Sequence, residues 1–394
     1  MEIIALAIIF AFSLGIEVLL FGKFAFSGLQ YRCEFSAPEA YEGDRLFLVE
    51  TVYNKKLLPV PWLKVDIHSS RWLDFAGTCS VVAQESRRVT SSFTLRGYQR
   101  TTRRWHLACL KRGVFTTENV TLVSGDLLNF KIVSIPVRVN ASLTVYPEII
   151  DLEDVFTPVN FQQSDNIVRR WIVDDPFIVA GARDYTGSDP LNRVHWPATA
   201  REGRLMIRKN DFTARNSLAI LLNMQSKPDE HADIVYRDKA ELGIKAAATF
   251  LNRALEAGMP VRLASNGCIP EEQNRTILTG EAADREHAAG LLKILAKLTM
   301  RTVKDFEYFL EDITGELANS QVIILTPYVS RRLGEQIRLL QDASNTVSVI
   351  LLDRVFELGA FPGDLEIYEV SEKYLAALAA GRTENEGIVQ NRTA

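Results

Sequence analysis

The stretch Leu218–Leu222, which reads LAILL, is apolar at every position and decides the fold of the second half of the chain. An unbroken apolar run of this length predicts a strand that is covered on both faces of a sheet. Later in the sequence, over 240–255, apolar residues recur every three or four positions, which predicts an amphipathic helix that ends at Gly258. Further strands are expected on the same grounds at Pro260–Ser265, Gln321–Thr326 and Val347–Asp353.

Strands that alternate with helices predict an α/β unit over 216–375, built on a doubly wound and mainly parallel sheet. In open sheets of this kind, ligands bind beyond the carboxyl ends of the strands. Neither GxxxxGKS/T nor GxGxxG follows the first strand, so a nucleotide site is not expected. The rule selects the polar residues that follow the strands: Asn223–Lys227, Ser265–Asn266, Thr326–Pro327 and Asp353.

In the region 28–150, apolar and polar side chains alternate with the period of β-strands. Trp62–Ile67 alternates apolar and polar side chains, as a half-buried strand does, and Pro59 and Pro61 before it indicate a turn or a sheet edge. Turn-forming residues return at short intervals, and about seven short strands are expected between them. The pattern predicts an antiparallel β-sandwich of the immunoglobulin type, a fold that serves mostly as a spacer or a binding surface.

Residues 3–22 read IIALAIIFAFSLGIEVLLFG and contain one charge, Glu17. About 20 helical residues rise about 30 Å, the thickness of the hydrocarbon core of a bilayer, so residues 1–27 are predicted to form a transmembrane anchor. A cleavable signal peptide is the alternative. It is disfavoured because no Lys or Arg precedes the run and no Ala-x-Ala site follows it.

The charges on either side of the anchor predict its orientation. Glu2 precedes the span, while Lys23 and Arg32 follow it. Because excess positive charge marks the cytoplasmic side, the chain is expected in the cell membrane with a single pass and its bulk in the cytoplasm.

Composition excludes several classes of protein. The chain has 394 residues, 47% hydrophobic and 24% charged, which is ordinary globular usage and excludes disordered, collagen-like and polytopic membrane proteins. The formal net charge of −4 gives no electrostatic reason to expect nucleic-acid binding. The four cysteines form no CxxC pair, so neither disulfides nor a zinc site is expected. They are expected to be buried, reduced thiols: Cys33, Cys79, Cys109 and Cys268.

A basic segment lies in the linker expected at 151–215. Residues 181–208 read GARDYTGSDPLNRVHWPATAREGRLMIR, in which Asp189 and Pro190 predict the start of a short helix. Over 181–215 there are seven Lys or Arg against four Asp or Glu. The segment is either a solvated face with local ion pairs, a docking surface, or a set of guanidinium groups that fix it to the carboxyl end of the sheet.

The pattern in this segment is carried by Arg183, Asp184, Tyr185, Gly187, Asp189, Arg193, Trp196, Ala200, Arg201, Gly203, Leu205 and Met206. It resembles the signature of the bacterial family called domain of unknown function 58. The resemblance covers most of the chain from Tyr31, through the upstream stretches Glu42–Gly43, Asn54–Leu63, Lys111–Phe115 and Val145–Pro147.

The resemblance implies an N-terminal membrane anchor, a β-sandwich and a von Willebrand factor A-like α/β domain. It also implies association with MoxR-type AAA ATPases and transglutaminase-like membrane proteins. No enzymatic activity is established for the family at large. The expected docking residues are Arg183, Asp184, Tyr185, Asp189, Arg193, Trp196, Arg201 and Gly203.

Von Willebrand A-like domains often carry Asp-x-Ser-x-Ser after the first strand, because a hard divalent cation prefers oxygen ligands. Here Asn223 lacks the charge and Gln225 replaces a hydroxyl. Lys227 would place an ammonium at the cation position, a repulsion of about 1 to 4 kcal/mol. No metal or other cofactor is therefore expected. If a cation does bind, the expected oxygen donors are Ser226, Thr326 and Asp353.

Two functional hypotheses follow. In the first, the chain is a membrane-anchored, non-enzymatic interaction or scaffold protein, held in the lipid bilayer through residues 3–22, and docks a cytoplasmic partner such as a MoxR-type AAA ATPase. In the second, it is a metal-dependent adhesion protein or a hydrolase acting at the carboxyl end of the α/β sheet. The histidines form no metal-binding cluster and no GxSxG elbow is present, which favours the first. His195 is interpreted as structural, Trp196 is expected in the core, and residues 376–394 are expected to form a polar tail.

Overall fold

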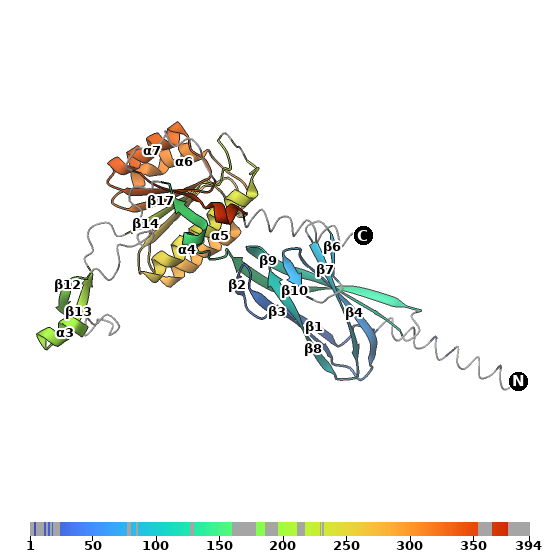
Figure 1. Cartoon of the computed structure of the whole chain (residues 1–394). Helices are drawn as coiled ribbons and strands as arrows, with labels where there is room; N and C mark the ends of the chain where they lie inside the picture. Colours follow the sequence, from blue (N-terminus) through green and yellow to red (C-terminus); the bar gives the residue numbers. More distant parts are fainter. Residues whose placement is uncertain are drawn as a thin grey trace. The chain divides into compact units, whose positions relative to one another are not determined.

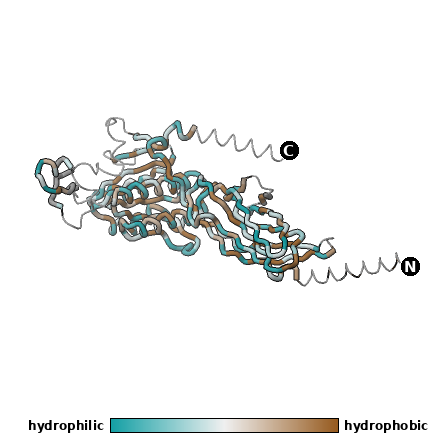
Figure 2. The backbone as a smooth tube through the Cα atoms, turned by 90° about the horizontal axis from the view of Figure 1, so that it is seen from below, coloured by the Kyte–Doolittle hydropathy of each residue, from teal (hydrophilic) through white to brown (hydrophobic). Residues whose placement is uncertain are grey.

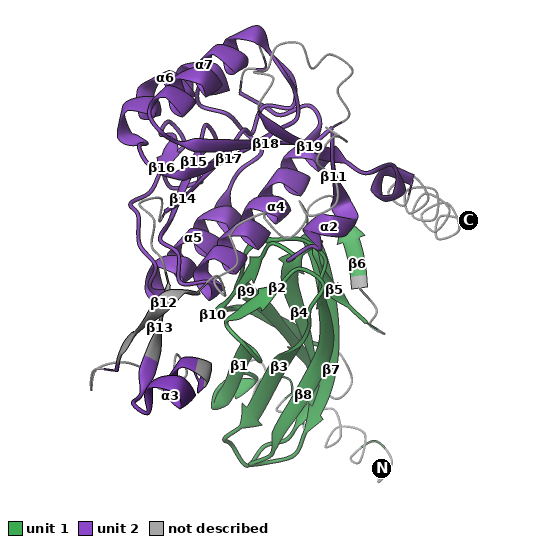
Figure 3. Ribbon diagram, turned by 60° about the vertical axis from the view of Figure 1, so that its left-hand side comes forward, with its two compact units in different colours: residues 1–148 green, residues 149–394 purple. Residues whose placement is uncertain are grey.

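The structure, a computed structural model, describes residues 4, 12, 15, 18, 24–76, 80–83, 86–126, 130–159, 179–185, 196–210, 217–228, 230, 232–353 and 365–376. The chain divides into two compact units, Met1–Glu148 and Ile149–Ala394, which Figure 3 shows in green and purple. Each unit has its own sheets and its own hydrophobic core.

Unit 1 is built from two β-sheets (Figure 1). One has the strand order β1-β3-β8-β5, and the other has the order β2-β10-β9-β4-β7-β6. Among the described strands the pairing is antiparallel, except that β2 and β10 are parallel. The strands are β1 Leu29–Phe35, β2 Glu39–Tyr41, β3 Arg45–Asn54, β4 Val60–Ser70, β5 Leu73–Phe75, β6 Ser80–Ala83, β7 Ser86–Leu95, β8 Arg100–Cys109, β9 Gly113–Gly125 and β10 Ile132–Tyr146.

The core of unit 1 lies between these sheets and follows from alternation along the strands. In β4, Leu63, Val65 and Ile67 are completely buried, as the alternation at Trp62–Ile67 predicts. Figure 2 shows hydrophobic positions, in brown, interleaved with hydrophilic ones along the strands. Because both sheets contribute to a single apolar cluster, they form a β-sandwich. Burial of each such aliphatic side chain stabilises the fold by about 1.5 to 3 kcal/mol.

One carboxylate lies inside this core. Glu50 of β3 is completely buried and accepts hydrogen bonds from the hydroxyls of Tyr31 and Ser91, each over 3.0 Å, and from the indole Nε1 of Trp105. Ser91 lies on β7 in the opposite sheet, so the cluster bonds the two sheets together. Burial raises the pKa of Glu50, although the three donors act in the opposite direction.

The described cysteines, Cys33, Cys109 and Cys268, are free and buried. Burial raises the pKa of Cys33 to about 12 and that of Cys109 to about 11. Thiols with so little thiolate at neutral pH are inert, which agrees with a structural role. Cys79 lies outside the described residues.

The anchor predicted at 3–22 falls almost entirely outside the described residues. No helix in the described part of the chain is both long enough and apolar enough to cross a bilayer. The continuous description begins at Phe24, and the anchor stays a prediction from the sequence.

Unit 2 contains a seven-stranded sheet in the order β11-β19-β18-β17-β14-β15-β16. The central strands from β19 to β15 are parallel, and the short edge strands β11 and β16 are antiparallel to their neighbours. Every residue of β14 is buried, as the LAILL run predicts. The strands are β11 Phe156–Pro158, β14 Leu218–Leu222, β15 Val261–Ser265, β16 Ile277–Leu278, β17 Gln321–Thr326, β18 Thr346–Leu351 and β19 Glu366–Val370.

Helices cover both faces of this sheet (Figure 1). The first face carries α4 Arg237–Glu256 and α5 Arg285–Lys297, and the second carries α6 Phe306–Ile313, the 3-10 turn η4 Thr314–Glu316 and α7 Arg331–Asp342. Alternate residues of the buried strands meet opposite layers. Leu221 and Ile324 join the cluster with α6 and α7, whereas Leu222 lies beside Gly243 of α4.

The region expected as a linker, 151–215, is more structured than predicted. Asp151 caps the short helix α2 Leu152–Val155, and β11 then pairs with β19, so residues 151–158 belong to unit 2. The signature segment forms a separate two-stranded sheet, β12 Val179–Asp184 with β13 Met206–Asn210, and the helix α3 Trp196–Glu202. All but residue 376 of the expected polar tail lies outside the described residues.

Candidate functional site

The carboxyl ends of the parallel strands carry a cluster of buried polar side chains. Asn223 follows β14, Asn266 follows β15 and Thr326 ends β17, and all three are completely buried. Asn223 Nδ2 donates to Thr326 Oγ1 over 3.1 Å, and Asn266 Oδ1 accepts the backbone N–H of Met224 over 2.8 Å. The parallel register thus joins residues 103 positions apart in the sequence.

Gln225 is the centre of this cluster. Its buried Nε2 donates to Asp305 Oδ1 over 2.9 Å and to the backbone carbonyl of Glu230 over 3.0 Å. Its Oε1 accepts the backbone N–H of Phe306 over 2.7 Å and the hydroxyl of Tyr328 over 3.2 Å. The amide is therefore fully hydrogen-bonded, and it ties the loop after β14 to the start of α6 and to the loop after β17.

Ser226 is bonded to a buried carboxylate. The carboxyl group of Glu230 accepts two hydrogen bonds from Ser226, from its backbone N–H over 2.6 Å and from its hydroxyl over 2.9 Å. It also accepts one from the backbone N–H of Val235 over 2.7 Å. Three hydrogen bonds to one buried side chain hold this loop in shape.

Lys227 is exposed at this edge of the sheet. A second cation, Lys239 of α4, places its Nζ 2.5 Å from Asp353 Oδ2 and 4.6 Å from the centre of the Tyr236 ring. The Asp353 carboxylate is thereby paired with a cation of the protein itself.

These contacts do not fit a divalent cation. The hydroxyl of Ser226 donates to Glu230, that of Thr326 donates to the backbone carbonyl of Tyr328 over 3.0 Å, and Asp353 is paired with Lys239. A calcium ion takes about six to eight oxygen ligands and repels an ammonium. Within the described ranges, no three His, Cys, Asp or Glu side chains gather in a group that could hold a metal.

Tyr328 belongs to the same cluster and acts as a hydrogen-bond donor. Burial raises the pKa of its hydroxyl, and the neighbouring Glu307 carboxylate raises it further. The phenol therefore stays protonated and donates to Gln225. Glu307 in turn accepts the hydroxyl of Ser330 over 2.8 Å, and Ser330 caps α7. Groups bonded in this manner hold the loops in shape.

The residues with a signature role lie on the hairpin of β12 and β13 and on α3. Arg183 and Asp184 are paired with Ile207 and Met206 across the hairpin, and the backbone N–H of Tyr185 donates to Leu205 over 2.9 Å. These bonds fix the backbone of the pattern in an antiparallel ladder.

The other signature residues lie on α3, just after it, or outside the described chain. Gly203 has φ +66°, a left-handed conformation that favours glycine, and its N–H donates to Thr199 over 3.0 Å to end the helix. Arg201, in the last turn of α3, is exposed. Asp189 and Arg193 lie outside the described residues.

The prediction that Trp196 lies in the core is wrong, because its side chain is 67% exposed. The seven-residue helix α3 turns a narrow face inward, and Ala198 and Thr199 take that face. Thr199 Oγ1 accepts the backbone N–H of Met206 of β13 over 3.0 Å. Trp196, at the first position of the helix, lies off that face.

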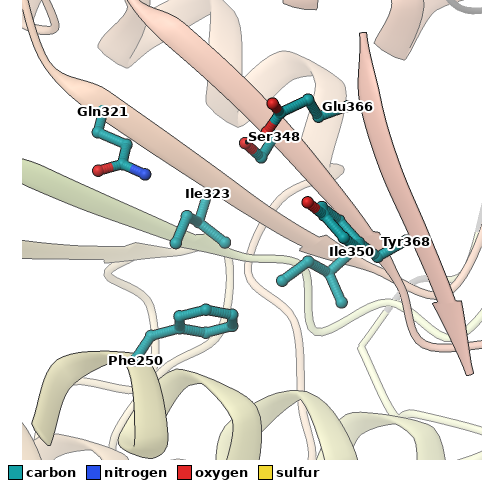
Figure 4. A pocket seen from close by; sticks show the side chains of 7 residues that line it. All are labelled: Phe250, Gln321, Ile323, Ser348, Ile350, Glu366 and Tyr368. Atoms are coloured by element: carbon teal, nitrogen blue, oxygen red, sulfur yellow. Dashed lines mark hydrogen bonds between the residues drawn. The ribbon is translucent and has the colours of Figure 1, made fainter. Parts of the chain in front are cut away.

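A pocket lies between α4 and the face of the sheet formed by β17, β18 and β19 (Figure 4). Phe250 of α4 faces Ile323 and Ile350 of the sheet, and Ser348 donates to Glu366 over 3.2 Å. Burial, followed by the Glu366 carboxylate, raises the pKa of Tyr368 to about 12. The lining residues are Phe250, Gln321, Ile323, Ser348, Ile350, Glu366 and Tyr368.

Comparisons with known proteins give a similarity in structure alone. No family model matches the sequence, and no curated protein matches it. A cohesin from Archaeoglobus fulgidus is similar in structure, at 11% identity and a TM-score of 0.21, over 29% of this chain and 91% of that one. A CARDB domain from Pyrococcus furiosus is similar at 11% identity and a TM-score of 0.18, over 29% of this chain and 93% of that one. Both are immunoglobulin-like β-sandwich modules, and at TM-scores this low they assign the chain no family and no function.

Proposed function

We propose that the chain is a membrane-anchored, non-enzymatic docking protein of the domain of unknown function 58 type, whose unit 2 is a von Willebrand factor A-like domain. The observation that carries the proposal is the closed carboxyl edge of the sheet. There the amide of Gln225, the hydroxyl of Ser226 and the carboxylate of Asp353 are all bonded within the protein. Such groups stabilise a binding surface and are poorly placed to coordinate a cation or transfer a proton.

The signature segment supplies the proposed docking surface. Its helix α3 presents exposed Trp196 and Arg201. Aromatic and arginine side chains dominate the binding energy of protein interfaces, so both are suited to contact a partner. The family resemblance makes the expected partner a MoxR-type AAA ATPase, with the docking surface in the cytoplasm.

The docking surface is tested by charge reversal. Tagged full-length chain is purified from detergent-solubilised membranes, and the wild type is expected to retain a MoxR-type AAA ATPase. Arg183→Glu and Arg201→Glu are each expected to reduce the retained ATPase at least tenfold, because reversal turns attraction into repulsion at the interface. The matched control is Arg338→Glu, at an exposed arginine of α7, and this variant is expected to retain the ATPase as the wild type does. Tolerance of both reversals, or no specific partner, would refute docking by this segment.

The metal-dependent alternative makes the opposite prediction in a thermal titration. We expect the unfolding midpoint of the full chain to stay unchanged in 1 mM Mg²⁺, Ca²⁺ or Mn²⁺. A cation bound with a dissociation constant one hundredth of its concentration would stabilise the fold by about 2.7 kcal/mol. A rise in the midpoint that disappears in Asp353→Ala would establish a metal site here and remove the proposed role.

A further inference from the structure

Three loops of unit 1 emerge at one end of its β-sandwich. The register pairs Val60 with Leu95, and Leu63 with Ser124. The loops at 54–59 and 96–99, and the described residues 126, 130 and 131 between β9 and β10, therefore lie at the same end of the sandwich. We call this end the tip.

The tip exposes large apolar side chains from each of its loops. Leu57 is 75% exposed, Leu58 54% and Phe130 71%, and Tyr98 and Ile132 are also exposed. Single exposed apolar residues are ordinary, but several of them gathered at one end indicate a surface that contacts something apolar.

The backbone of the tip is rigid. Buried Asn54 donates through Nδ2 to the carbonyls of Leu58 and Arg96, over 2.9 and 3.0 Å, so one side chain holds two loops. A Cβ at Gly97 would lie 2.3 Å from the carbonyl oxygen of Leu57, so the loops meet more closely than any other residue type allows. Tyr98 has φ 56°, a conformation that a bulky residue rarely adopts. The tip is therefore a preformed surface, and its strained tyrosine points to a function rather than to stability.

The charges around these apolar side chains are positive. Segments 54–59 and 96–100 contain Lys55, Lys56, Arg96 and Arg100, and neither segment contains Asp or Glu. The connection between β9 and β10 contains Lys131 and one acidic residue, the buried Asp126. An apolar centre with a basic rim is complementary to an anionic membrane surface.

The chain enters unit 1 at this same end. Leu29, the first residue of β1, pairs with Asn54, and the Lys56 ammonium donates to the carbonyls of Phe24 and Ala25, over 2.5 and 2.6 Å. The predicted anchor at 3–22 ends two positions before Phe24. A segment that leaves the bilayer at residue 22 thus reaches the tip within a few residues.

We propose that the tip lies in the headgroup region of the bilayer, with its apolar side chains inserted and its cations on anionic lipid headgroups. This inference rests on the anchor in the proposed function and goes beyond it, since it makes the β-sandwich a second membrane contact. The inserted residues are Leu57, Leu58, Tyr98, Phe130 and Ile132, and the cations are Lys55, Arg96, Arg100 and Lys131.

Fluorescence quenching by nitroxide-labelled lipid tests the insertion. Full-length chain carrying Cys79→Ser and Leu57→Cys is labelled at position 57 with an environment-sensitive fluorophore, while the buried native thiols stay unlabelled. The chain is reconstituted in phosphatidylcholine vesicles with 30% phosphatidylglycerol. The matched control is Leu110→Cys, which is 50% exposed beyond the end of β8, at the opposite end of the sandwich. We expect quenching at position 57 at least threefold greater than at position 110.

Charge reversal separates the headgroup contact from insertion. Lys55→Glu with Arg96→Glu is expected to lower the quenching at position 57 at least twofold in vesicles with phosphatidylglycerol, with little change in pure phosphatidylcholine. Arg45→Glu, at the opposite end of β3, is the control and is expected to change neither.

The outcomes distinguish the tip from the anchor. Equal quenching at positions 57 and 110 in a chain that floats with the vesicles would overturn the tip contact and leave the anchor and the docking function standing. A chain that does not float at all would overturn both the anchor and the tip contact. If quenching is stronger at position 57 than at position 110 but does not change on charge reversal, only the headgroup contact would be refuted.

Discussion

Replacing Gln225 by Leu is expected to destabilise unit 2 by about 4 kcal/mol. The change leaves the N–H of Phe306, the hydroxyl of Tyr328, one oxygen of Asp305 and the carbonyl of Glu230 without the partner that the amide provides. Each buried polar group that loses its partner costs about 1 to 3 kcal/mol. Urea unfolding followed by circular dichroism at 222 nm measures the effect, because helices α4 to α7 all belong to unit 2. Gln273→Leu, at an exposed glutamine, is the control and should cost less than about 0.5 kcal/mol.

The substitution Gln225→Glu adds a pH signature to the same site. A carboxylate at this position would face the oxygen of Asp305, 2.9 Å from the present Nε2, and both burial and repulsion would raise its pKa. At low pH the protonated acid can donate as the amide does. The loss of stability relative to the wild type should therefore grow as pH rises from 5 to 8. A loss that is equal at both pH values would mean that Asp305 does not face this side chain.

The second large effect is expected at Glu50, in the core of unit 1. Glu50→Leu leaves the indole of Trp105 and the hydroxyls of Tyr31 and Ser91 without their acceptor, at a cost of about 3 kcal/mol. Tryptophan emission during urea unfolding reports on this unit, since three of the five tryptophans lie in it, at positions 62, 72 and 105. An unchanged midpoint would show that this cluster does not hold the two sheets together.

The raised pKa of Glu50 also predicts how the stability of unit 1 depends on pH. Burial raises the pKa of this carboxyl in the folded chain above its unfolded value, so the folded state binds more protons between the two values. The free energy of unfolding therefore falls as pH rises through that interval, and this contribution of Glu50 is lost above the folded pKa. Glu50→Gln should remove this part of the pH dependence, whereas Glu34→Gln, at an exposed glutamate on β1, should leave it intact.

The elements of unit 2 could be predicted wherever periodicity was strong. The apolar run at Leu218–Leu222 and the helical spacing over 240–255 correspond to β14 and α4, because burial on both faces or on one face leaves a distinct pattern. The pairing of β11 with β19 joins Phe156 to Val370. No local pattern reports a contact of that range, so residues 151–158 looked like a linker.

The candidate site was predicted in its positions but not in its chemistry. The rule for open sheets selected Asn223, Asn266 and Thr326, which the structure brings into contact. The partners that decide what these groups do were missed: Glu230, Lys239, Asp305 and Tyr328. They come from loops and helices whose approach depends on the whole fold. Trp196 was misplaced because its aromatic character suggested burial, and a helix as short as α3 has little interior to offer.

The two borders of the seven-stranded sheet restrict how another polypeptide can join unit 2. The outermost strands, β11 and β16, are only three and two residues long, and β11 ends in Pro158, which has no amide hydrogen to donate. Borders this short offer little template for an added strand, and they also resist the border-to-border stacking that leads to fibrils. Among the described strands, recognition by unit 2 is therefore expected to operate through side chains rather than through an added strand.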